Sequence, residues 1–144
     1  MNDKSFNSSV QNKENRISVE NYSEWIEIKK PHILIDVRTE PEVEICSLNA
    51  SINIPLETIE SNGGLDKILK LMEETDKFDG ISEMNVQNVK RVVFVCRRGN
   101  DSQIARQILE RHFDSKNCDK IIICDIIGGL EAWANRIDAN FPKY

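Results

Sequence analysis

The chain has 144 residues, enough for one domain with a substantial buried core. Its formal net charge of −5 excludes the broad basic surface typical of nucleic-acid-binding proteins, so we expect no direct contact with nucleic acid. Residues 1–15 are polar and predict a disordered tail or linker before a single domain over residues 16–144. Because no signal peptide or membrane span is visible, we expect a cytoplasmic protein without membrane contact.

The first third of the domain predicts strands on either side of a helix. Residues 17–19 are a short strand candidate, and a helix is expected from residues 22–25 with Ser23 as its N-cap. The nearly continuous apolar run at 33–37 is typical of a strand buried on both faces. Residues 50–56 alternate in polarity and end near a proline, which predicts a short edge strand.

The second half of the chain continues the alternation of predicted helices and strands. Residues 65–74 have apolar positions at helical spacing, and residues 77–90 lack a pattern and predict a loop or insertion. Residues 91–95 predict a central strand and residues 102–113 a helix with one apolar face. Residues 121–124 predict a further buried strand.

The paired glycines Gly128-Gly129 predict a tight turn before a final helix at 130–137. Close packing is sufficient to explain this pair, so we assign it no chemistry. Strands alternating with helices predict an α/β fold with a mostly parallel central sheet and helices on both faces.

Cys96 directly follows the predicted strand at 91–95, and ligand sites in parallel sheets lie beyond the carboxyl ends of the strands. Loop amides and a helix start point donors at a sulfur placed there and stabilise its anion. We therefore expect Cys96 to be a catalytic nucleophile cradled by the loop that follows it. An inert core cysteine is the alternative, although it would not require a polar loop. The expected cradle consists of Arg97, Arg98, Gly99, Asn100, Asp101 and Ser102, with Gly99 allowing a tight bend and Ser102 capping the next helix.

A cysteine phosphatase would need an arginine six positions after the cysteine to bind the phosphate oxygens. Ser102 occupies that position here, and Asp101 precedes it. An acidic side chain at the rim should repel dianions, which disfavours both a phosphatase and a thiosulfate-dependent enzyme. A donor that arrives as a persulfide on another protein's cysteine remains compatible with this loop.

Asp36 and Arg38 follow the buried strand at 33–37, and we expect them to form charge-assisted bonds that brace neighbouring loops. A surface ion pair of little energetic consequence is the alternative. The remaining arginines of the strand and helix segments are expected on solvated faces: Arg91, Arg106 and Arg111.

Three further cysteines accompany Cys96. Cys124 lies in an apolar strand and is expected in the core, whereas Cys118 lies in a polar loop. Cys46 is the better candidate for a second thiol that converts a persulfide into a disulfide. The sequence has no CxxC pair, and its two histidines are not spaced as zinc ligands, so we expect no metal site and no cofactor.

Three segments of the chain resemble the rhodanese domains. The segments are LIDVRTEPEVEICSLNASINIPL (34–56), VVFVCRRGNDSQIA (92–105) and DIIGGLEAW (125–133). An aspartate as the sixth loop residue, VEIC after DVR, and the final IDANFPKY resemble one subfamily in particular. That subfamily is the C-terminal rhodanese domain of molybdopterin-synthase sulfurylases, the adenylyltransferase and sulfurtransferase proteins that activate ubiquitin-like sulfur carriers.

The resemblance implies a three-layer α/β sandwich in which Cys96 accepts sulfane sulfur as a persulfide, with a cysteine desulfurase as donor. It implies transfer to the adenylated C-terminus of a ubiquitin-like sulfur carrier, for molybdopterin synthesis or tRNA thiolation. The adenylating domain would belong to the same full-length protein or to a separate chain, since no ATP-binding motif is present in this one. A rhodanese-like module that binds partners without transferring sulfur is the alternative.

Overall fold

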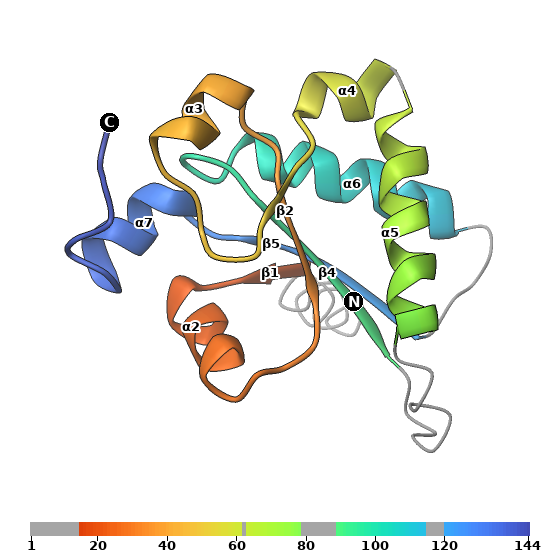
Figure 1. The fold of residues 1–144 in the computed structure, drawn as a ribbon, viewed down its shortest axis with the longest axis horizontal. Coiled ribbons are helices and arrows are strands. Elements are labelled where there is room, and N and C mark those ends of the chain that lie inside the picture. The colour runs from red at the N-terminus through yellow and green to blue at the C-terminus, as the bar shows by residue number, and fades with distance from the viewer. Residues whose placement is uncertain (1–14, 62, 79–88, 115–119) are drawn as a thin grey trace, which may run out of the picture.

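The structure, a computed structural model, describes residues 15–61, 63–78, 89–114 and 120–144. Its centre is a five-stranded, all-parallel sheet in the order β1-β5-β4-β2-β3. The expected α/β architecture is therefore confirmed (Figure 1), and the strand order places the short strand of the 50–56 segment at a sheet edge. The strands are β1 (Arg16–Ile17), β2 (Ile33–Asp36), β3 (Ile52–Asn53), β4 (Lys90–Val95) and β5 (Ile121–Ile126).

Helices cover both faces of the sheet (Figure 1). One apolar core lies between the sheet and α4, α5 and α6, and a second core lies between the sheet and α2 and α7. The predicted three layers are thus present. The helices are α2 (Val19–Glu27), α3 (Glu40–Ile45), α4 (Leu56–Ser61), α5 (Gly64–Phe78), α6 (Asp101–Asp114) and α7 (Gly129–Arg136).

The central strands supply both cores because successive side chains of a strand point to opposite faces. Ile35 is in register with Phe94, and both join the core under α4, α5 and α6. Leu34 is in register with Val93, and both join the core under α2 and α7. This burial on both faces explains the nearly continuous apolar runs of β2 and β4.

Two helix starts differ from the prediction. Helix α2 begins at Val19 and not near Tyr22, and its N-cap is Ser18, whose Oγ accepts a hydrogen bond of 3.0 Å from the Asn21 amide. Ser23 is therefore not the cap. Helix α6 begins at Asp101, which places Ser102 inside the first turn and excludes it as the N-cap.

Two short helices were absent from the prediction, α3 and α4. Helix α3 buries none of its residues, so it lacks the apolar periodicity that identifies a helix in sequence. Its sequence signals are confined to the helix start, where Thr39 and Glu42 form a capping box and a proline occupies the first turn.

The predicted loop at 77–90 is shorter than expected at both ends. Helix α5 continues to Phe78 and β4 begins at Lys90. Residues 79–88 lie outside the described part of the chain, as do residues 1–14 of the predicted tail. Among the described helices, none has the length and apolar character needed to cross a bilayer.

Candidate functional site

Cys96 follows β4 at the carboxyl end of the sheet, and its side chain is 4% exposed. Its Sγ accepts hydrogen bonds from the Gly99 amide at 3.1 Å and from the Ser102 amide at 3.3 Å. The thiol is also within hydrogen-bond distance of Ser102 Oγ, at 3.4 Å. Two main-chain donors thus converge on the sulfur, an arrangement that stabilises negative charge there.

The expected cradle residues divide into two groups. Gly99 and Ser102 contact the sulfur, and Ser102 can do so because the first amides of a helix have no partner within it. The other four cradle amides form no hydrogen bond with Cys96 Sγ in the described structure. Those residues are Arg97, Arg98, Asn100 and Asp101, and all four line the cavity beside the thiol.

Hydrogen bonds from the start of α7 hold the cysteine loop in place. The Leu130 amide donates to the Cys96 carbonyl at 2.9 Å, and the Glu131 amide donates to the Arg97 carbonyl at 2.9 Å. A Cβ at Gly129 would lie 2.3 Å from the Cys96 carbonyl oxygen, so only glycine permits this approach. The glycine pair that we attributed to packing alone therefore also holds the cysteine loop in place.

Residues that the sequence analysis left unassigned hold the Gly99 carbonyl. It accepts a hydrogen bond from Gln103 Nε2 at 2.8 Å and another from Arg16 Nη2 at 3.3 Å. Gln103 directly follows Ser102 in the first turn of α6, while Arg16 comes from β1. The contact from Arg16 joins residues 83 positions apart, and no local sequence pattern signals it.

A buried carboxylate anchors Arg16. Asp125 is fully buried at the end of β5, and it pairs with Arg16 at 3.0 Å and with Arg106 Nε at 2.8 Å. Arg106 also pairs with Glu110 and is only 7% exposed. Our expectation of a solvated Arg106 is wrong, because Asp125 provides a buried counter-charge from another element.

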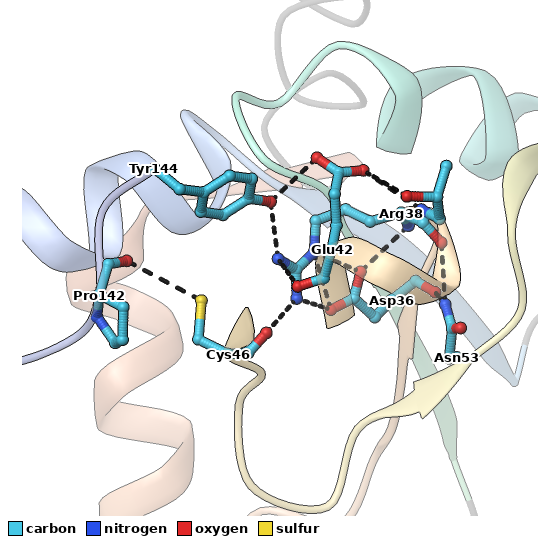
Figure 2. Close-up of polar contacts among 8 residues, drawn as sticks. Asp36, Arg38, Glu42, Cys46, Asn53, Pro142 and Tyr144 are labelled. Carbon is cyan, nitrogen blue, oxygen red and sulfur yellow. Dashed lines mark hydrogen bonds and ion pairs between the residues drawn. The ribbon is translucent and has the colours of Figure 1, made fainter. Parts of the chain in front are cut away.

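Asp36 and Arg38 form a buried ion pair, with 0% and 4% exposure respectively. Arg38 Nη2 lies 2.7 Å from Asp36 Oδ2, and the same nitrogen donates to the Cys46 carbonyl at 2.6 Å. The side-chain Nδ2 of Asn53 donates to the main-chain carbonyls of Asp36 and Arg38, at 2.9 Å each. These bonds join the end of β2, the residue that follows α3 and the end of β3 (Figure 2).

Tyr144 extends this cluster to the last residues of the sequence (Figure 2). Its hydroxyl accepts a hydrogen bond from Arg38 Nη1 at 2.7 Å and donates one to Glu42 Oε2 at 3.0 Å. Burial disfavours the charged form of Arg38, but the bonds to Asp36 and Tyr144 outweigh burial and raise its pKa above the ordinary value. Arg38 is therefore held as a fixed cation whose charge Asp36 compensates.

A cavity of about 430 Å³, here called the Cys96 cavity, opens beside the thiol. Three arginines and four acidic residues are among those that line it. The arginines are Arg38, Arg97 and Arg98, and the acidic residues are Glu42, Glu57, Glu60 and Asp101. The cavity is large enough for an extended peptide segment or a small ligand, and its carboxylates disfavour dianions.

The remaining cysteines lie apart from this cavity or outside the described residues. Cys124 is fully buried, and burial raises its pKa to about 12. Cys46 is half-buried with its Sγ 3.8 Å from the Pro142 carbonyl, and it is not among the described residues that line the Cys96 cavity. Cys118 falls in the segment that the structure does not describe.

Comparison with known proteins identifies a family from sequence and a shared fold from structure. Residues 18–136 match the family described as "Rhodanese-like domain". The chain is 40% identical over 132 residues to an "Adenylyltransferase and sulfurtransferase MOCS3" of Xenopus laevis. The matching region covers 92% of this chain and 28% of that relative. The protein of the same name from Drosophila sechellia is 43% identical over 129 residues, covering 90% and 24%. The chain thus spans about a quarter of the length of these curated relatives.

Solved structures show the same fold at low sequence identity. A Saccharomyces cerevisiae protein, described as a homolog of single-domain rhodanese and Cdc25 phosphatase catalytic domain, superimposes with a TM-score of 0.68 at 12% identity, covering 88% of this chain and 83% of that one. A human single-domain sulfurtransferase has a TM-score of 0.56 at 15% identity, covering 84% and 96%. With a family match over most of its length and this shared fold, the chain belongs to the rhodanese-like domain family.

Proposed function

We propose that this domain is a sulfurtransferase that carries sulfane sulfur as a persulfide on Cys96. The observation that carries the proposal is the convergence of the Gly99 and Ser102 amides on Cys96 Sγ beside an open cavity. Donors in this position stabilise a thiolate before sulfur arrives and an anionic persulfide afterwards. The sulfurtransferase names of the curated relatives support the same activity.

Sulfur loading proceeds by exchange between a thiolate and a persulfide. The Cys96 thiolate attacks the outer sulfur of a persulfide on a donor protein, for which a cysteine desulfurase is the proposed source. A sulfur–sulfur bond forms at Cys96 while the donor's own sulfur–sulfur bond breaks, and the donor cysteine leaves as a thiolate. No net oxidation or reduction is needed in this step.

The proposed acceptor is the adenylated C-terminal carboxyl of a ubiquitin-like sulfur carrier. The outer sulfur of the Cys96 persulfide attacks that carbonyl carbon, a carbon–sulfur bond forms, and AMP leaves. A second thiol, from a cysteine of this chain or of a partner, then attacks Cys96 Sγ. The sulfur–sulfur bond breaks, the carrier leaves as a thiocarboxylate, and a disulfide remains at Cys96.

Adenylation itself is assigned to a separate adenylating domain. The names of the curated relatives combine an adenylyltransferase with a sulfurtransferase, and this chain corresponds to only part of their length. Thiocarboxylated carriers of this kind would serve molybdenum cofactor biosynthesis or tRNA thiolation. We propose Asp36 and Arg38 as bracing residues for the cavity wall rather than as groups that contact sulfur.

The cysteine phosphatase alternative receives no support from the arrangement at position 102. The small Ser102 side chain contacts the sulfur there, where a phosphatase of this type needs an arginine to bind phosphate oxygens. Hydrolysis of an aryl phosphate by the wild-type domain, lost in Cys96→Ala, would reverse this assignment.

The test of the proposed function is reconstitution with a cysteine desulfurase, cysteine, an adenylating enzyme with ATP, and a ubiquitin-like carrier. We expect the carrier mass to increase by the replacement of one oxygen by sulfur in the presence of the wild-type domain. The Cys96→Ala variant should leave the carrier unchanged. Equal thiocarboxylate formation with the wild-type domain and Cys96→Ala would favour a binding module that does not transfer sulfur.

A further inference from the structure

The three arginines among the residues that line the Cys96 cavity differ in how their charges are compensated. Arg38 is paired with buried Asp36 at 2.7 Å. Arg98 lies 3.6 Å from the Glu131 carboxylate. Arg97 forms no ion pair with any residue that the structure describes.

The face of an aromatic ring holds Arg97 instead. Its guanidinium carbon lies 4.2 Å from the centroid of the Tyr144 ring. An aromatic face attracts a cation through its quadrupole but carries no net charge, so the guanidinium is oriented without being neutralised. A carboxylate in the same place would have cancelled the charge.

Tyr144 is held by contacts other than its contact with Arg97. Its hydroxyl lies between Arg38 and Glu42, accepting from the first and donating to the second (Figure 2). These bonds attach the ring to the wall of the Cys96 cavity, since both partners line that cavity. The ring therefore links the segment after β2 to the cysteine loop.

We propose that Tyr144 is a positioning residue that holds Arg97 beside Cys96 as an uncompensated cation, and that Arg97 attracts the anionic sulfur group of the donor. This inference rests on the proposed sulfur-transfer function. Four carboxylates line the same cavity, so an incoming anion would meet repulsion without a cation held at this position. Tyr144 acts through Arg97 and does not contact sulfur.

Two alkylating reagents measure the potential at Cys96 without any sulfur transfer. Iodoacetate is an anion, whereas iodoacetamide is neutral and reacts with the same thiolate. The ratio of their rates at Cys96, followed by peptide mass spectrometry, reports the attraction of anions to the cavity. We expect Arg97→Ala and Tyr144→Leu each to lower this ratio about threefold to tenfold, the scale of one cation near a partly exposed site.

Two further variants separate positioning from general structural support. Tyr144→Phe keeps the ring that contacts Arg97 but loses the two hydroxyl bonds that hold the ring in place, so we expect a smaller loss than in Tyr144→Leu. The double variant Arg97→Ala/Tyr144→Leu should have the ratio of Arg97→Ala alone, because the ring acts only through that guanidinium. Arg136→Ala is the matched control, since it removes an arginine from an exposed pair with Glu20, neither of which is among the described residues that line the Cys96 cavity, and should leave the ratio unchanged.

The proposal would be overturned by an alkylation ratio in Tyr144→Leu equal to that of the wild type. It would also be overturned by a loss in Tyr144→Phe as large as that in Tyr144→Leu, or by effects of the two substitutions that multiply in the double variant. Failure of the proposed function looks different. In that case Cys96 would take up no sulfur from a donor, while the alkylation ratios would still follow the pattern given above.

Discussion

Gly99 and Gly128 lie so close together that a Cβ at Gly99 would be 2.7 Å from the backbone nitrogen of Gly128. Gly99 also has φ +94°, a conformation that L side chains rarely adopt. Because its amide lies 3.1 Å from Cys96 Sγ, any shift that admits a side chain also moves a donor away from the sulfur. We expect Gly99→Ala to slow persulfide formation about tenfold or more, as when one preorganised donor is lost.

The control for this variant is Gly63→Ala. Gly63 also has a positive φ, +73°, but nothing lies within 4 Å of its Cβ position. Both variants therefore incur backbone strain, and only Gly99→Ala displaces the cysteine loop. Equal rates of persulfide formation in the two variants, followed by intact mass over time, would contradict the role given to the Gly99 amide.

The buried pair of Asp36 and Arg38 predicts a large loss of stability when one partner is removed. Arg38→Met leaves the Asp36 carboxylate buried without its counter-charge, and we expect the free energy of unfolding to fall by about 3–5 kcal/mol. The exposed pair of Arg136 and Glu20 is the comparison, and Arg136→Ala should cost about 0–1 kcal/mol. Urea denaturation of both variants measures the difference, and equal losses would argue against a bracing role for Arg38.

The contrast between Cys96 and Cys124 predicts selective alkylation. Cys124 is fully buried, and burial raises its pKa to about 12, so at about pH 8 its thiolate is scarce as well as inaccessible. Cys96 lines an open cavity and accepts two amide hydrogen bonds. Peptide mass spectrometry of the folded domain should therefore find iodoacetamide at Cys96 and none at Cys124, whereas modification at similar rates would be inconsistent with this assignment.

Glu42 predicts a dependence of stability on pH. Burial raises the pKa of its carboxyl, but hydrogen bonds from Thr39 and Tyr144 and the charge of Arg38 together lower the pKa below the ordinary value of 4.5. A lowered folded-state pKa contributes stability above the unfolded-state pKa, and this contribution is lost as the pH falls through the folded-state value. The wild type should therefore lose stability relative to Glu42→Gln below about pH 4.5, as measured by urea denaturation at several pH values. Parallel pH profiles for the two proteins would contradict this.

The sequence predicted those parts of the fold whose signals are local. The apolar runs of β2, β4 and β5 are long because both faces of these strands are buried, and the amphipathic pattern of α6 follows from packing on one side. Helix α3 escaped prediction because none of its residues is buried. The start of α2 was misjudged because Val19 packs into the core at the first helical position, where it resembles a strand residue.

The site likewise contains residues that local sequence signals predict and residues that only the tertiary fold brings together. Cys96 and its loop were predictable from a strand end, a polar segment and a helix start along one stretch of chain. Arg16, Asp125 and Tyr144 were not, because they reach the site from distant elements and their contacts depend on the tertiary fold. Arg106 shows the limit most clearly, since its counter-charge Asp125 is 19 residues away on another element.

The most direct test of the central claim is the intact mass of the domain after incubation with a persulfide donor and removal of that donor. We expect the wild-type domain to gain the mass of one sulfur atom, located at Cys96 by peptide mapping and removed by a reducing thiol. Cys96→Ala should fold normally and gain nothing. An equal gain in Cys96→Ala, or no gain in the wild type, would contradict the assignment of Cys96 as the sulfur carrier.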